Sequence, residues 1–221
     1  MSRRSLPIAA AGLGVVALIA WLAVGRGGGT EPLAQTDPAP AITEVASPAA
    51  ATITSSAPTE DAARAAALDY VSATQDWLYL SDDEVAAAVE AVSTPEAGPR
   101  LSEEAVAELR AAREVLADSP GRVWLVVRPL ASKVERFEGS GARVSVWTVR
   151  VLSAADVALP QAEWLRVGLD LAWVGGSWLI EDLRETPGPT PLNATTDQPW
   201  QPEPFEEALD GYHRVGAAPP A

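Results

Sequence analysis

Residues Ala162–Arg184, AEWLRVGLDLAWVGGSWLIEDLR, predict a β-hairpin around which the rest of the chain is organised. Two apolar, aromatic-rich segments flank Gly175-Gly176. Such a glycine pair favours a tight turn, because both central residues of a primed turn need a positive φ. The few charged side chains that interrupt the hairpin include Arg166, Asp170, Glu181 and Asp182. One face of the sheet must therefore be covered, and the other face half covered.

Three amphipathic segments upstream are expected to supply that cover. Thr59 can cap a helix over about residues 60–78. Ser81 and Glu84 form a capping-box pattern that begins a second helix. Ser102 can cap a third helix over residues 103–117.

Strands are expected to follow the helices. They are Val123–Arg128, a bend at Pro129, Ser132–Glu138, a glycine turn at residues 139–141, and Ala142–Leu152, with a loop at residues 153–161 before the hairpin. Helices first and an antiparallel sheet after them is the α+β pattern, with the helices against one concave face.

The composition divides the 221 residues into one domain with appendages. Prolines and glycines are concentrated before and after an Ala-, Val- and Leu-rich middle. The expected organisation is a transmembrane anchor at residues 1–26, a disordered linker at 27–58, an α+β domain at 59–186 and a Pro-rich tail at 187–221.

The N-terminal segment predicts a single-pass membrane anchor. Arg3 and Arg4 precede an uncharged stretch from Leu6 to Val24, close to the length that crosses a bilayer of ~30 Å as a helix. The positive-inside rule then places the N-terminus in the cytoplasm and the domain outside the cell membrane. A cleaved signal peptide is the alternative, with a small-residue site near Gly25.

Charge and residue usage exclude several classes of function. The net charge is −14 and Lys133 is the only lysine, which argues against direct binding of nucleic acid. The chain has no cysteine, and its single histidine, His213, lies in the tail without a ligand-spaced partner. We therefore expect no catalytic residue, no metal and no cofactor.

The layout resembles a known fold family. Three helices before a curved antiparallel sheet that ends in "WVGGSWLIEDLR" and "PGPTP" resemble the nuclear transport factor 2-like (NTF2-like) cone fold. With the anchor and tether, the phrases "RVSVWTVRVL" and "WLRVGLDLAWVGGSWLIEDL" resemble membrane-anchored proteins of actinobacterial conjugative and integrative elements. Those proteins are similar to Tcp-type scaffold subunits of conjugative type IV secretion systems. The resemblance implies a non-enzymatic role in assembling an envelope complex. The implied partners are the membrane and other secretion subunits, and a homo-oligomer is left open.

Tyr70 and Asp170 are the candidate cavity residues. Enzymes with a cone fold place an acidic residue in the cavity opposite a Tyr or His, and a carboxyl with a raised pKa could move a proton there. Alternatively, Asp170 lies on a solvated sheet face or pairs with Arg150 or Arg166. Five tryptophans fall within strand patterns, which favours core packing or a sheet-face patch over carbohydrate stacking: Trp124, Trp147, Trp164, Trp173 and Trp178.

The tail contains a candidate partner-binding motif. Pro204 can open a short helix that Gly211 ends, with Phe205, Leu209 and Tyr212 on one side. A helix this short orders only by docking on its own domain or on a partner. A solubilising tail is the alternative.

The leading hypothesis is a non-enzymatic scaffold subunit of a conjugative, type IV secretion-like envelope complex. A cone-fold enzyme or binder of a small apolar ligand, and an accessory subunit of a lipid-uptake system, are the alternatives.

Overall fold

The computed structural model describes residues 57–117, 123–154, 158–191 and 207–215. The predicted transmembrane segment 1–26, nearly all of the linker 27–58, and Phe205 lie outside these residues. Within the described ranges, no helix has both the length and the apolar character needed to cross a membrane.

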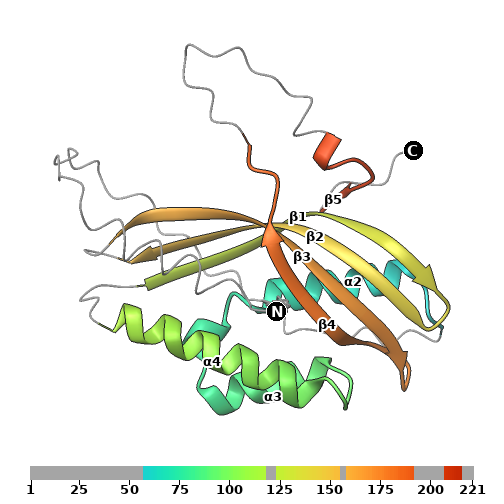
Figure 1. The fold of residues 1–221 in the computed structure, drawn as a ribbon, viewed down its shortest axis with the longest axis horizontal. Coiled ribbons are helices and arrows are strands. Elements are labelled where there is room, and N and C mark those ends of the chain that lie inside the picture. The colour runs from blue at the N-terminus through green and yellow to red at the C-terminus, as the bar shows by residue number, and fades with distance from the viewer. Residues whose placement is uncertain (1–56, 118–122, 155–157, 192–206, 216–221) are drawn as a thin grey trace, which may run out of the picture.

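The described residues form an α+β fold, in which three α-helices precede a five-stranded antiparallel sheet (Figure 1). A short 3₁₀ helix, η1, lies between the first two α-helices. The sheet has the order β4-β3-β2-β1-β5. The elements are α2 (Glu60–Ala73), η1 (Trp77–Tyr79), α3 (Asp82–Val92), α4 (Gly98–Leu116), β1 (Val123–Glu138), β2 (Gly141–Ala154), β3 (Ala158–Val174), β4 (Ser177–Pro187) and β5 (His213–Arg214).

The predicted starts of the first two helices are confirmed. The Thr59 side chain accepts a hydrogen bond from the Ala62 amide at 3.2 Å, and Ser81 with Glu84 forms a reciprocal capping box. α2 is shorter than expected, because it ends at Ala73 and the chain then tightens into η1. The Thr74 hydroxyl donates to the Val71 carbonyl at 2.8 Å, a local bond that competes with the regular helical pattern.

The predicted start of the third helix is wrong. α4 begins at Gly98 rather than at residue 103, with a proline in its first turn. Proline suits that position because its missing N–H has no helical partner there. Ser102 is therefore a buried residue inside the helix, where its hydroxyl lies within hydrogen-bond distance of the Pro99 carbonyl and the Glu90 carboxylate.

The central hairpin is confirmed. Gly175 and Gly176 have φ values of 61° and 89°, and the flanking residues pair as Trp173 with Trp178. Upstream, the two predicted strands around Pro129 are one strand, β1, with a register shift at the bend. The expected loop at 153–161 is also wrong, because β2 continues to Ala154 and β3 starts at Ala158.

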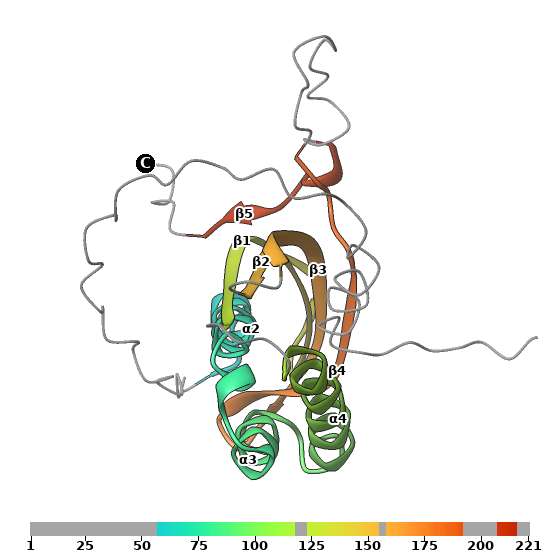
Figure 2. The ribbon, with the colours of Figure 1, turned by 90° about the vertical axis from the view of Figure 1, so that its left-hand side faces the viewer.

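The sheet curves over the helices, with α2 beside β1 and β2 and with α3 and α4 below (Figure 2). Alternate residues of each strand face the helices and enter a single core. On β3 these are Leu165, Val167, Leu169 and Leu171, all at most 3% exposed.

The opposite, outer face is partly covered by the chain that follows β4. The Trp147 indole donates to the Pro189 carbonyl at 3.0 Å and stacks on Trp164 at 5.3 Å. Trp178 belongs to the core, whereas Trp124 is 56% exposed. The tryptophans are thus divided among the core, the outer face and solvent.

Other parts of the chain form hydrogen bonds at points along both sides of the β4–β1 sheet. On β1, the Leu125 amide donates to the Tyr79 hydroxyl at 3.0 Å, and β5 pairs with Ala131 and Ser132. On β4, the Ile180 carbonyl accepts from the Thr94 amide at 2.9 Å.

Candidate functional site: an apolar groove beside a buried ionic cluster

A groove of about 330 Å³ lies between α2 and α3, above the β3–β4 hairpin. Its walls are mostly alanines, and its floor is formed by the hairpin. The wall residues include Ala62, Ala66 and Ala73 of α2 and Ala88 and Ala91 of α3; the floor includes Leu171, Trp178 and Ile180.

The alanine-rich helix sequences account for the groove. α2 turns Ala63, Ala67, Tyr70 and Val71 into the core, so that the alanines beside them face α3. Alanine is an excellent helix former, but its single methyl group cannot fill the space between two helices. Val92, at the end of α3, remains 36% exposed on the groove.

Residues with polar groups lie among the apolar lining, and they include Asp69, Tyr70 and Trp178. The Asp69 carboxylate is at the groove, and partial burial raises its pKa above the ordinary value. The Trp178 indole N–H is buried without a hydrogen-bond partner among the described residues. Tyr70 packs edge-on against Trp77 with ring centroids 5.5 Å apart. Burial, and secondarily the nearby carboxylates of Glu185 and Glu108, raise the Tyr70 pKa far above its usual value, so its hydroxyl stays neutral.

A cluster of charged side chains lies inside the fold. The Arg150 guanidinium, only 5% exposed, donates to both carboxylate oxygens of Glu185 at 2.8 Å. Glu163 is 3.7 Å from the other end of the guanidinium, too far for a hydrogen bond. Glu108 of α4 faces the same guanidinium across a cavity of about 10 Å³, close to the smallest space that holds one water molecule.

The cluster contains more carboxyl groups than cations. Burial and then the Glu185 charge raise the Glu108 pKa to about 8, although Arg150 partly opposes this shift. Burial also raises the Glu163 pKa. The Glu108 carboxyl is therefore protonated at neutral pH. The cluster links β2 and β4 to α4, because Arg150 of β2 binds Glu185 of β4 and lines the same small cavity as Glu108.

Asp170 and Tyr70 are not brought together. Tyr70 lines the groove, whereas Asp170 lies on the outer face of β3, where its carboxylate accepts two hydrogen bonds from Arg143 at 2.6 and 2.9 Å. The partner is thus Arg143, rather than Arg150 or Arg166.

The ionic cluster was not predicted from the sequence, although a signal for it was present. On β2, Arg150 stands in the buried alternation Val144, Val146, Thr148, Leu152. A charged residue on the buried face of a strand needs an internal partner. Strand alternation could have identified Arg150, but not its partners on other elements.

The tail residues 207–215 lie against the outer face of the sheet. The Tyr212 hydroxyl is 2.6 Å from the buried Ser145 hydroxyl, and the Lys133 ammonium donates to the Asp210 carbonyl at 3.0 Å. Leu209 is half-buried, and His213 is exposed on β5. In the part of the chain that the structure describes, no three His, Asp or Glu side chains form a group that could hold a metal ion.

No protein-family model matches the sequence, and no curated protein sequence matches it either. Among solved structures, an IcmL-like type IV secretion system protein from Legionella pneumophila subsp. pneumophila str. Philadelphia 1 is 13% identical, with a TM-score of 0.46 over 62% of this chain and 99% of that one. Aln2 from a Streptomyces species is 17% identical, with a TM-score of 0.38 over 59% and 93%. The intermembrane-space region of the chloroplast protein ARC6 is 12% identical, with a TM-score of 0.36 over 59% and 100%. Likenesses this distant transfer no function to this chain.

Proposed function

We propose that this chain is a membrane-anchored, non-enzymatic interaction subunit of a conjugative, type IV secretion-like envelope complex. In this proposal its domain is an NTF2-like cone outside the cell membrane, and the groove between α2 and α3 binds a partner subunit. The observation that carries the proposal is the groove itself, an apolar surface flanked by two helices. Apolar surfaces of this kind are typical of sites where proteins associate.

Two further observations support an interaction role over catalysis. The pair suggested by the sequence, Asp170 with Tyr70, does not form in the groove, because Asp170 is bound to Arg143 on the outer face. The charged cluster around Arg150 is enclosed by the core, with room for about one water molecule.

The membrane part of the proposal rests on the sequence. Arg3 and Arg4 precede the uncharged stretch to Val24, and a Pro- and Ala-rich tether follows it. Washing membranes with alkaline carbonate should leave the full chain in the pellet, and protease added to spheroplasts should remove a tail epitope. Release into the supernatant would instead support a cleaved signal peptide, and a protected tail would reverse the orientation.

The interaction role is tested by measuring conjugative DNA transfer in cells in which the transfer depends on this protein. Ala91→Arg places a long charged side chain in the groove, and we expect it to lower the transfer frequency at least tenfold. Ala87→Arg is the matched control, since it lies exposed on the same helix but does not line the groove. Equal transfer by the two variants, at equal protein levels, would remove the groove from the proposal.

A further inference from the structure

We infer that the groove binds an amphipathic α-helix of a partner protein, whose apolar side fills the space between α2 and α3 and which carries a Lys or Arg against Asp69. This inference rests on the proposed function, because it names the class of partner for the same groove. The shape of the walls and an unpaired carboxylate support it.

The walls of the groove favour a helix as the occupant. α2 and α3 lie on its two sides, and both present alanines at helical spacing, such as Ala62 and Ala66 on α2. Helices pack with their axes about 8–10 Å apart, and the smaller the side chains at the contact, the closer the approach. A third helix laid along this surface would place its larger apolar side chains over Leu171 and Ile180 on the floor.

The charge of the groove indicates that the occupant carries a positive charge. Asp69 is the only charged residue among its lining residues, and it has no hydrogen bond or ion pair within the described ranges. One helical turn away stand Ala65, Ala66 and Ala73, so α2 supplies no cation to it. A carboxylate left unpaired beside apolar surface is stabilised when a cation binds next to it.

The net charge of the whole chain also favours a positively charged partner. With a net charge of −14, the chain attracts basic partners and repels acidic ones during the approach.

The floor of the groove contains a spectroscopic reporter. Trp178 lines the groove, and its indole N–H is buried without a partner in the described part of the chain. Because this side chain forms part of the floor, we expect its ¹H–¹⁵N signal to change when the groove is occupied.

The inference is tested with three synthetic helical peptides that share one Leu/Ala stripe and differ at a single position, which is Lys, Gln or Glu. Each is titrated against the full chain in detergent, and binding is followed by fluorescence anisotropy. We expect the Lys peptide to bind about threefold to tenfold more tightly than the Gln peptide, the range of a partly exposed ion pair, and the Glu peptide to bind most weakly. The preference should shrink in high salt.

Three variants place the binding in the groove. Asp69→Asn should reduce the preference for Lys over Gln to the smaller remainder that the net charge of the chain produces. Ala91→Arg should weaken all three peptides, whereas Ala87→Arg should not. The ¹H–¹⁵N signal of the indole, assigned by its loss in Trp178→Phe, should shift on binding.

The possible outcomes distinguish a failure of this inference from a failure of the proposed function. Equal affinity for the Lys and Glu peptides, or a Lys preference that Asp69→Asn does not reduce, would overturn the inference. The same holds if none of the three peptides binds and a small apolar dye such as 1-anilinonaphthalene alone shifts the indole signal. The loss of DNA transfer in Ala91→Arg is measured separately and would still support the groove as a partner site. Conversely, the wild-type chain could bind the Lys peptide selectively while Ala91→Arg transfers DNA normally. This result would support the groove as a helix-binding site and would contradict the conjugative role.

Discussion

At the scale of single residues, Arg150 places a positive charge inside the core of the described domain. Its guanidinium is almost fully buried and faces Glu185, Glu163 and Glu108. Burying a charge is costly, and the cost is recovered only when the partners are close and well oriented. The two 2.8 Å bonds from Arg150 Nη2 to the Glu185 carboxylate meet this condition, so removing either residue leaves the other without this ionic partner.

We expect Arg150→Met to lower the free energy of unfolding by about 3–5 kcal/mol, because it leaves the Glu185 carboxylate buried without a cation. The double variant with Glu185→Leu should recover part of this loss, since no charge then remains unpaired. Urea unfolding followed by tryptophan fluorescence measures both. Arg143→Ala, which breaks the more exposed pair with Asp170, should cost less than about 1 kcal/mol. A similar cost for both arginine variants would contradict this view of the cluster.

Glu108 makes the stability of the domain depend on pH. Its pKa is about 8 in the folded chain against 4.5 as an ordinary value. Below about pH 4.5 the carboxyl is protonated in both the folded and the unfolded chain. Between pH 4.5 and 8 only the folded chain holds the proton, so its contribution to stability is lost as the pH rises through this window.

We therefore expect the melting temperature to fall from pH 5.5 to pH 8.5, and Glu108→Gln to fall less steeply. Glu163, whose pKa is also raised, acts in the same direction and accounts for a remaining slope in the variant. Parallel slopes for wild type and Glu108→Gln would show that Glu108 ionises normally in the folded chain.

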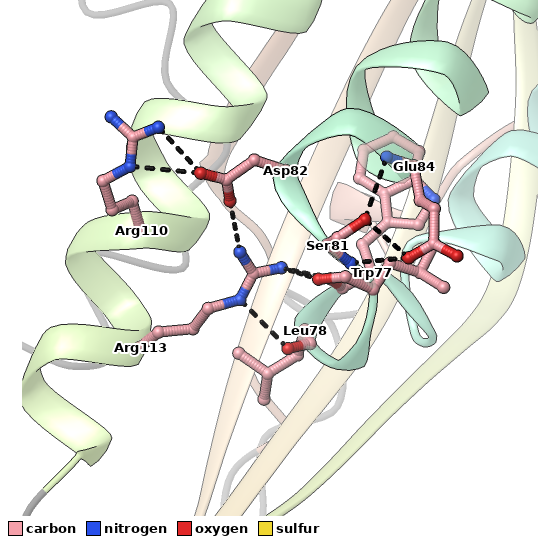
Figure 3. Close-up of polar contacts among 8 residues, drawn as sticks. Trp77, Leu78, Ser81, Asp82, Glu84, Arg110 and Arg113 are labelled. Atoms are coloured by element: carbon pink, nitrogen blue, oxygen red, sulfur yellow. Dashed lines mark hydrogen bonds and ion pairs between the residues drawn. The ribbon is translucent and has the colours of Figure 1, made fainter.

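At the scale of elements, Arg113 of α4 fixes the turn between η1 and α3 (Figure 3). Its guanidinium donates to the carbonyls of Leu78 and Trp77 at 3.2 and 3.0 Å, to the Leu80 carbonyl, and to the Asp82 carboxylate at 2.6 Å. The Trp77 carbonyl also accepts from the Leu80 amide at 3.3 Å, and all three carbonyls lie in or just after η1, where the helix ends. One planar guanidinium thus joins three elements.

Arg113→Lys should destabilise the domain by about 2–3 kcal/mol, because a single ammonium cannot reach three carbonyls and a carboxylate together. Arg110→Lys is the matched control on the same helix: Arg110 binds only Asp82 in the described structure and is 61% exposed, so we expect a loss below about 1 kcal/mol. Melting temperatures of the two variants decide the point. If both fall equally, the carbonyl contacts of Arg113 add nothing to stability.

Local patterns predicted the elements where the determining contacts are local. Thr59, Ser81 and the Gly175-Gly176 pair act within a few residues of themselves, and the structure confirms all three. The predicted start of α4 is wrong because a serine before an apolar stripe has the pattern of an N-cap, whereas Ser102 lies inside the helix that starts at Gly98. The outer position of Asp170 agrees with the apolar alternation of Leu165, Leu169 and Leu171 on the opposite face of β3, a signal that the sequence contained. The register that sets Asp170 opposite Arg143 depends on residues far apart in the sequence.

At the scale of the whole molecule, the tail returns to the domain. Residues 207–215 lie against β1 and β2 through Tyr212, Asp210 and the two-residue strand β5. The motif proposed from the sequence, Phe205, Leu209 and Tyr212, stays a prediction, because Phe205 is outside the described residues. Tyr212 nonetheless has a position that an experiment can test.

Tyr212→Phe should loosen the tail by about 1 kcal/mol, because it leaves the buried Ser145 hydroxyl without its tyrosine partner. The Val215 amide, which donates to the Leu130 carbonyl at 2.9 Å, should then exchange faster with deuterium, while the melting temperature of the domain changes little. His213→Ala, at an exposed position next to it, should leave the exchange rate unchanged. Unchanged exchange in Tyr212→Phe would mean that the β5 pairing alone holds the tail.

Contacts along the sheet edges affect how copies of this chain can associate at high density. A bare strand edge invites another strand, and chains held at high density then polymerise through backbone hydrogen bonds. Here the Tyr79 hydroxyl and β5 occupy points along β1, and Thr94 occupies β4. Sheet growth at these points first requires an intramolecular bond to break. We therefore expect densely gathered copies of this chain to extend the sheet less readily at these points than a chain with bare edges would.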